Sequence, residues 1–461
     1  MGSLEELAPT FPVLDDPLPN DTSLPAFMVS TKRGFLPRMD PIATLPPEFA
    51  PLEAILQAMP VKTLDGSPGL LAQSKLGETV DANLPDLTPF VDKYSTNLPL
   101  MNALYRDYSF LASAYLLEPC HTRFTGGEPY GLGRSTLPRN IALPISRCAS
   151  ILAFKPFMEY AGSYALFNYT LISPTQGLVP SNLRLIRAFE HGLDPSSSEA
   201  GFVLVHIDMA RHSGPLVTST LQVLSSVQSH SRPQLNEGLS SLLSSLRQIN
   251  TAMETMWTRS KPHQYTSFRT FIFGITSQSM FPHGVVYEGV SDQPVSFRGE
   301  SGANDSMIPL VDNLLEIPMP DTPLTEILKD FREYRPSNHR EFLGWVRARS
   351  EGMGLKEWAV QDGESRKLWV MCLDQVREFR WRHWCFAREY IMKRTRHPTA
   401  TGGSPIVTWL PNQLGAVLEE MARLGEGCEG CEGVMEVVER QRGMLEREVR
   451  RFCEERGVGR D

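Results

Sequence analysis

The sequence predicts a mainly α-helical protein with two domains, a small N-terminal domain and a large all-helical one. Apolar residues recur at steps of three and four in most segments, the spacing that lines one helix face. Convincing strands are few. The interior stretch Asp194-Pro195-Ser196-Ser197-Ser198 has the composition of a linker. We therefore expect domains at 1–197 and 198–461.

The small domain is expected to begin with an extended arm. Residues 1 to about 50 are rich in proline, which favours a chain that wraps the body or is partly disordered. Helical spacing follows, because Leu100, Leu104, Tyr108 and Leu111 lie on one face. The predicted elements are helices from Phe49, over Leu98–Leu117 and over Ile145–Ala165, a glycine-dense loop at 126–133 and a short hairpin within 166–180.

The large domain is predicted to be helical almost throughout. Its two glycine-rich interruptions are the stretch from Gly284 to Gly302 and the break at Thr399–Ser404. The last helix is charged and amphipathic, with a stripe that includes Val438, Leu445 and Phe452. The predicted helices are 198–215, 235–253, 320–334, 340–348, 376–391, 414–424 and 434–455.

Composition excludes several classes of protein. The 461 residues are 41% hydrophobic and 21% charged, which is typical of a globular chain. A net charge of -8 argues against a nucleic-acid partner held by phosphate contacts. No apolar run is long enough for a membrane span, and the acidic N-terminus does not resemble a signal peptide. Seven cysteines fit a reducing compartment, so we expect a cytoplasmic location.

His383 is the most informative candidate residue. Val376, Phe379, His383, Phe386 and Tyr390 are spaced by 3, 4, 3 and 4, which puts the histidine in the middle of an apolar stripe. A buried imidazole without a partner is costly. The segment alone therefore indicates either a core histidine bonded to the protein or a ligand of a metal.

Three further residues allow both a structural and a functional interpretation. His206, on another apolar helix, is either a bonded core histidine or a polar group that faces a cofactor from the side opposite His383. Arg269 stands among aromatics, as an ion-pair partner or as a bidentate clamp on a substrate carboxylate. Arg380, one turn before His383, lies on a solvated face or contacts an acidic group of the bound molecule.

Other motifs carry little chemistry. The loops at 297–303 and 400–403 place hydroxyl groups between glycines, where backbone can approach a ligand closely, although each alone is more often a plain turn. Cys428 and Cys431 form a lone CxxC without the second pair that a zinc site needs. No P-loop, dinucleotide fingerprint or nucleophile elbow is present.

Five blocks of sequence occur in a distinctive order. They are 106–117, 137–144, 284–290, 297–303, and Arg380-x-x-His383 followed by Tyr390-Ile391. In this order they resemble the indoleamine 2,3-dioxygenase family, over roughly Phe35 to Leu414. The proline-rich start and His206 are similar to the fungal branch.

The resemblance implies a haem dioxygenase that converts L-tryptophan with O₂ to N-formylkynurenine in the kynurenine pathway. It implies haem b between the domains, held mostly by the second and covered on its distal side by the first, in a protein expected to be monomeric. His383 matches the axial iron ligand. The other implied roles are catalysis for His206 and Ser301, substrate binding for Tyr160, Ser163, Gln264, Tyr265, Arg269, Gly302 and Thr401, and a haem-propionate contact for Arg380.

Departures from the family pattern concern the substrate. The family has two adjacent aromatics where this chain has Gln264-Tyr265, and Gln-Ser where it has Asn304-Asp305. If Gln264 faces the indole, its amide favours a ring that bears a polar group. Alternatively, Gln264 points away and Tyr265 stacks on the ring. The competing functions are therefore a haem oxygenase for a tryptophan-derived indole of secondary metabolism, and a haem-binding sensor without turnover.

Overall fold

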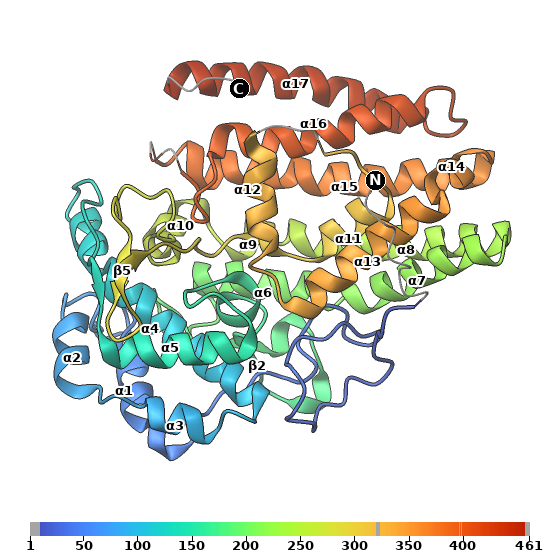
Figure 1. Cartoon of the computed structure of the whole chain (residues 1–461). Coiled ribbons are helices and arrows are strands. Elements are labelled where there is room, and N and C mark those ends of the chain that lie inside the picture. Colours follow the sequence, from blue (N-terminus) through green and yellow to red (C-terminus); the bar gives the residue numbers. More distant parts are fainter. Residues whose placement is uncertain (1–9, 320–322, 396, 398, 457–461) are drawn as a thin grey trace.

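Helices dominate the molecule. The computed structural model describes residues 10–319, 323–395, 397 and 399–456, and most of these are helical (Figure 1), which confirms the mainly α class. The ends of the predicted domains, residues 1–9 and 457–461, lie outside the described residues. No helix in the described ranges combines the length and the apolar character needed to cross a bilayer.

The N-terminal part is built around one long buried helix, α4 (Leu98–Thr125). Asn97 caps it by accepting a hydrogen bond from the Leu100 amide at 3.1 Å, and almost every residue from Pro99 to His121 is buried. The surrounding helices are α1 (Ala50–Ala58), α2 (Leu76–Asn83), α3 (Thr88–Lys93) and α5 (Arg139–Leu152), with a π-helical turn at Tyr160–Tyr164.

Two predicted elements of this part have different boundaries. Helix α5 ends at Leu152, not Ala165, because Ala153 adopts a left-handed conformation with φ 56°. The short hairpin is wider than predicted, since β2 (Tyr169–Leu171) pairs with β3 (Leu183–Leu185), which lies beyond the predicted range. The intervening segment supplies the turns that the sequence pattern could not place.

Both parts of the chain contribute to a three-stranded sheet. Strand β1 (Thr136–Leu137) from the N-terminal part pairs in parallel with β4 (Val285–Tyr287), which pairs antiparallel with β5 (Ser291–Val295). The sheet therefore connects the two halves. The division into two domains stays a prediction of the sequence.

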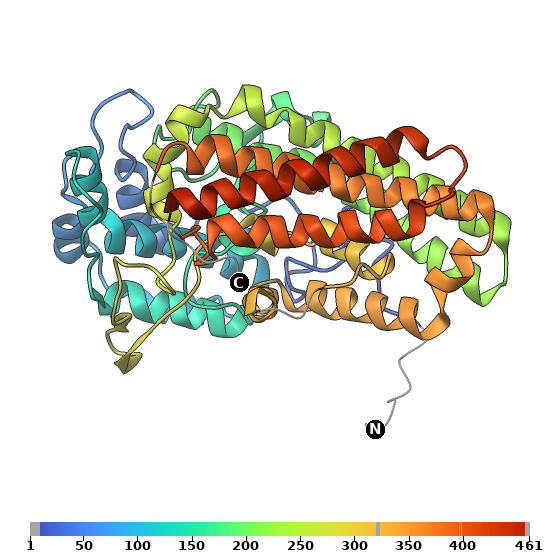
Figure 2. The same cartoon turned by 90° about the horizontal axis from the view of Figure 1, so that it is seen from above.

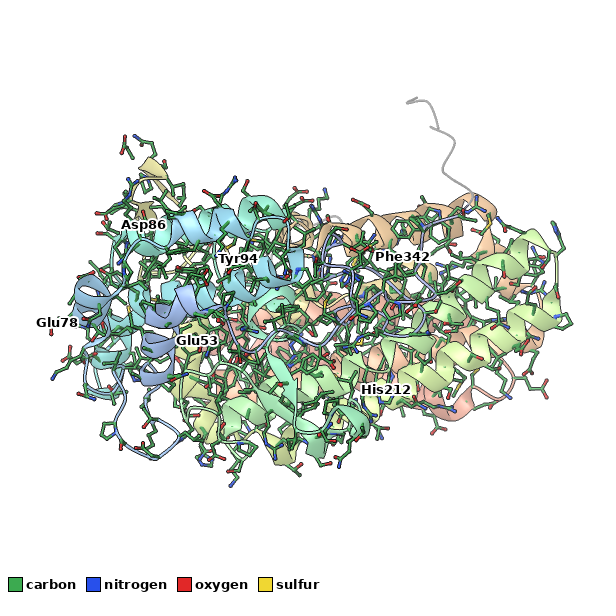
Figure 3. All side chains as sticks on the ribbon, turned by 90° about the horizontal axis from the view of Figure 1, so that it is seen from below. Glu53, Glu78, Asp86, Tyr94, His212 and Phe342 are labelled. Atoms are coloured by element: carbon green, nitrogen blue, oxygen red, sulfur yellow. The ribbon has the colours of Figure 1, made fainter. Side chains whose placement is uncertain are left out.

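The proline-rich arm packs on the C-terminal half. The ring of Phe11 lies 5.3 Å from that of Phe342 in α13 (Ser337–Met353), and Figure 3 shows Phe342 among the side chains where the arm crosses this half. The Phe35 amide donates to the Ser213 hydroxyl at 2.9 Å. The arm thus reaches well beyond the small domain to which it was assigned.

Helix α15 (Gly363–Phe386) is the axis of the C-terminal half. It packs against α8 (Arg232–Glu254) on one side and α16 (Ile406–Gly425) on the other, and continues as a π-helical turn at Ala387–Met392. The other helices here are α6 (Ser198–Ala210), α7 (Ser213–Gln228), α9 (Met256–Arg259), α10 (Pro262–Arg269), α11 (Met307–Leu314), α12 (Pro323–Arg332), α14 (Leu355–Val360) and α17 (Glu432–Arg456).

The last helix, α17, makes hydrogen bonds to the segment that carries His383. Helices α16 and α17 run side by side along α15 (Figure 2). Glu448 of α17 accepts hydrogen bonds from the fully buried Trp384 indole nitrogen at 2.6 Å and from Arg388 at 2.7 Å. The contact is therefore made at the residue that follows His383.

We expect Glu448→Ala to lower the free energy of unfolding by ~1–3 kcal/mol, because it leaves the buried Trp384 N–H without an acceptor. Chemical denaturation measures the effect. Glu446→Ala, an exposed position on the same helix, is the matched control and should change stability by less than about 0.5 kcal/mol. Equal stability of the two variants would contradict the anchoring role of Glu448.

Candidate functional site

His383 borders two adjoining cavities. The larger has a volume of about 460 Å³ and the smaller about 170 Å³, and both are lined by Phe379 and His383 of α15, by Gly302 and Asp305, and by Leu410. No hydrogen bond to the His383 ring occurs among the described residues. Burial lowers its pKa to about 4, and His206 and Arg380 lower it further in the same direction. The imidazole is therefore neutral, the form that ligates a metal.

His206 faces the smaller cavity from α6. Ser197 caps this helix by accepting from the Ala200 amide at 3.1 Å. The His206 Nδ1 donates to the Phe202 carbonyl at 2.9 Å, so Nε2 is left unprotonated. Burial lowers its pKa to about 4. A Cβ added to Gly302 would lie 3.8 Å from Nε2, an ordinary van der Waals distance, so the loop backbone at Gly302 lies next to the imidazole.

The larger cavity has more cations than carboxylates. It is lined by five arginines, which are Arg332, Arg335, Arg340, Arg347 and Arg380, and by Asp305, Asp312, Glu333 and Glu351. Arg380 donates to Asp312 at 2.6 Å, but its Nη1 is buried without a partner. Burial raises the pKa of Asp312, while the nearby arginines, with Arg380 first, lower it. The wall therefore suits a bound anionic group.

These features fit the haem that the resemblance implies. A haem needs one neutral axial imidazole, an apolar space beside it and cations for its propionates. His383 supplies the neutral imidazole, and the cavity that His383 and His206 both line supplies the apolar space. The unpaired donor of Arg380 supplies a cation for a propionate. The predicted pairing of His206 with His383 across one space is also consistent with this arrangement.

The glycine-rich loops form one wall of the smaller cavity. The Thr401 hydroxyl donates to the Glu300 carbonyl at 2.8 Å, and the Thr401 carbonyl accepts from the Gly274 amide at 2.9 Å. Ser301, Gly302 and Thr401 all line the cavity, as does Tyr160 from the opposite π-helical turn. The structure thus brings these four predicted site residues together.

Arg269 lies outside both cavity walls. It is fully buried, and one of its terminal nitrogens donates to the Thr399 carbonyl at 3.0 Å. Its Nε and Nη1 have no partner, and its guanidinium lies 4.6 Å over the Phe273 ring. Burial raises the pKa of Tyr265, and the Arg269 charge opposes that rise. Arg269 is therefore close to Tyr265, which lines the cavity, and has two free donors.

Besides Arg269, two predicted substrate contacts do not line the cavities. The Gln264 amide oxygen accepts from the Ser198 hydroxyl at 2.5 Å, and Gln264 lines neither cavity, whereas Tyr265 does. The Ser163 hydroxyl donates to the Glu159 carbonyl at 2.7 Å and is fully buried in its own turn. Of the two alternatives for Gln264, the hydrogen bond to Ser198 favours the one in which Gln264 points away and Tyr265 contacts the ring.

Glu300 is a cavity residue that the sequence did not single out. Its side chain is 2% exposed, lines the smaller cavity and has no hydrogen-bond partner among the described residues. Burial raises its pKa to about 8, with a further contribution from Glu159. A glutamate in a glycine-rich loop usually faces solvent, so no sequence signal could have revealed this position.

Comparisons with known proteins point to one family. A family model described as indoleamine 2,3-dioxygenase matches residues 23–423. Human indoleamine 2,3-dioxygenase 2 is 23% identical over 87% of this chain and 95% of its own length. The 6-hydroxytryptophan 2,3-dioxygenase fscD of Fusarium equiseti is 25% identical over 71% of this chain and 74% of its length. The indoleamine 2,3-dioxygenase nanC of Aspergillus nanangensis is 26% identical over 75% and 80%.

We expect Glu300→Gln to stabilise the protein increasingly as pH rises. In the folded protein the Glu300 pKa is about 8 against an ordinary 4.5, so the carboxyl favours folding below 4.5 and this contribution is lost as pH rises toward 8. The gain in unfolding free energy of the variant over the parent should grow by up to about 1.4 kcal/mol per pH unit in this range. Denaturant unfolding at several pH values measures it. A pH-independent difference would mean that Glu300 is already ionised when folded.

Proposed function

Because this chain belongs to the indoleamine 2,3-dioxygenase family, whose members are haem-dependent, we propose that it holds haem b and uses O₂ to open the indole 2,3-bond of L-tryptophan or a close derivative. The observation that supports this most strongly is the neutral His383 imidazole in an enclosed space, opposite His206 and beside the unpaired donor of Arg380.

In this proposal each residue has a definite task. His383 would ligate the haem iron, and Arg380, oriented by Asp312, would bind a propionate. Bound haem supplies the activation of O₂. Phe202, Tyr265 and the methionines of the smaller cavity exclude water and contact the indole. His206, with Nδ1 committed to the Phe202 carbonyl, presents an acceptor at Nε2 toward the substrate. Ser301 positions the loop by accepting from the Ala303 amide at 3.2 Å.

Substrate identity separates the competing functions. The relative named 6-hydroxytryptophan 2,3-dioxygenase supports a hydroxylated indole, and the relatives named indoleamine 2,3-dioxygenase support an indoleamine with no stated ring substituent. Product analysis with L-tryptophan, its ring-hydroxylated derivatives, O₂ and a reductant distinguishes both from a haem-binding sensor, which would form no product. The monomeric state and the cytoplasmic location stay predictions of the sequence.

We expect His383→Ala to purify with little or no haem, since His383 is the one histidine among the described residues that line the larger cavity. The Soret absorbance relative to total protein measures haem content. His212→Ala removes a histidine that lines neither cavity and is labelled in Figure 3; this control should bind haem normally. A normal ferrous spectrum in His383→Ala, or haem loss in His206→Ala alone, would refute the assignment.

Arg269→Lys should raise the KM for L-tryptophan roughly ten- to a hundredfold, because lysine keeps the charge and loses the bidentate fork, at a cost of ~1.5–3 kcal/mol. Haem content should stay normal, which separates a binding defect from misfolding. Steady-state kinetics on L-tryptophan and tryptamine provide the test. Equal activity of the parent protein on both would show that no carboxylate is recognised.

A further inference from the structure

The smaller cavity contains two polar groups that the chain does not satisfy. The Tyr160 hydroxyl and the Glu300 Oε1 are both buried without a hydrogen-bond partner, and both residues line the cavity. Tyr160 is fully buried and Glu300 is 2% exposed. Aromatic and methionine side chains make up a large part of the surrounding wall. Unpaired polar groups in such surroundings are costly, and a bound ligand is one explanation for keeping them.

Both groups are held in place by well-bonded backbone. Glu159 caps the π-helical turn of Tyr160 by accepting from the Ala161 amide at 2.9 Å and from the Gly162 amide. The Glu300 carbonyl accepts from Thr401 at 2.8 Å. A Cβ on the preceding Gly299 would lie 2.2 Å from the Gly274 amide nitrogen, so the loop is packed tightly. The backbone that carries the two unpaired groups is therefore well ordered by its own hydrogen bonds and packing.

Arg269 and Glu300 both act on Tyr265, which lines the smaller cavity. Burial raises the pKa of Tyr265, the Arg269 charge opposes that rise, and the Glu300 carboxyl adds to it. In the proposed function, a substrate whose carboxylate is bound by Arg269 would hold its ring in the cavity that Tyr265, Glu300 and Tyr160 line.

The chemistry of the pair defines the group it can bind. A neutral carboxyl offers one donor and one acceptor, and a phenol offers the same. A hydroxyl group complements both at once, whereas an unsubstituted benzene ring complements neither. We propose that Glu300 and Tyr160 bind a hydroxyl group on the benzene ring of the indole, so that ring-hydroxylated L-tryptophans are the preferred substrates. This specificity rests on the proposed dioxygenase function.

The test compares hydroxyl and methyl groups of similar size at the same ring position. Haem-loaded protein is assayed with 5-, 6- and 7-hydroxy-L-tryptophan and the matching methyl-L-tryptophans, by kcat/KM and by the Soret shift on binding. We expect the best hydroxy isomer to exceed its methyl counterpart on the order of tenfold or more. Equal values for all three pairs would overturn the proposal.

Three variants assign the effect to the two residues. Glu300→Leu and Tyr160→Phe should each bring the hydroxyl-to-methyl ratio close to one, while haem content and thermal midpoint report correct folding. Glu300→Gln keeps a donor and an acceptor and should retain most of the preference. Loss of activity on hydroxy and methyl substrates alike in Glu300→Gln would instead indicate an ionised carboxylate that pairs with the substrate ammonium, and would overturn the proposal.

The readouts keep this inference separate from the function on which it rests. If the parent protein turns over no indole, the proposed dioxygenase function fails, and the Soret titration still reports whether the hydroxyl group is recognised. If L-tryptophan is turned over and the methyl and hydroxy pairs bind alike, the function stands and the specificity fails.

Discussion

The burial of an uncharged imidazole at His383 is the constraint on which the site depends. Removal from water lowers the pKa of His383 to about 4, so the ring stays neutral at physiological pH and can ligate a metal. Helices α8 and α16 flank the helix that carries it, and Glu448 of α17 fixes the neighbouring Trp384. A metal-ligating side chain is only as well oriented as its surroundings make it. The C-terminal helix lies beyond the matched family region. Through Glu448 it thus helps to orient the helix that carries His383.

The two cavities beside His383 differ in charge, so each suits a different kind of bound group. The larger is lined by five arginines and suits anionic groups of a cofactor. The smaller holds His206 and Glu300, both of which burial keeps uncharged, among aromatic and methionine side chains. A space that contains few charges admits an indole and excludes water. The polar groups that remain there are therefore the ones that distinguish one indole from another.

The sequence predicted much of this molecule, for identifiable reasons. Helical spacing gave the helix around His383 and the helix of His206, because their apolar stripes are long and regular. It misjudged the end of α5, where the left-handed Ala153 is a local backbone event without a sequence signature. Side-chain direction was the larger difficulty. Gln264 and Tyr265 are adjacent in the sequence, yet the Gln264 amide is hydrogen-bonded to Ser198 whereas Tyr265 lines the cavity. The position of Glu300 in the cavity wall depends on tertiary packing, which brings loops that are distant in the sequence into contact.

Isotope labelling tests the central claim most directly. Reduced, haem-loaded protein is incubated with L-tryptophan and with ring-hydroxylated L-tryptophans under ¹⁸O₂, and the products are analysed by mass spectrometry. Cleavage of the indole 2,3-bond by a dioxygenase predicts a ring-opened N-formyl product that carries both labelled oxygen atoms. A product with a single labelled atom, or no ring-opened product from any of these indoles, would contradict the account.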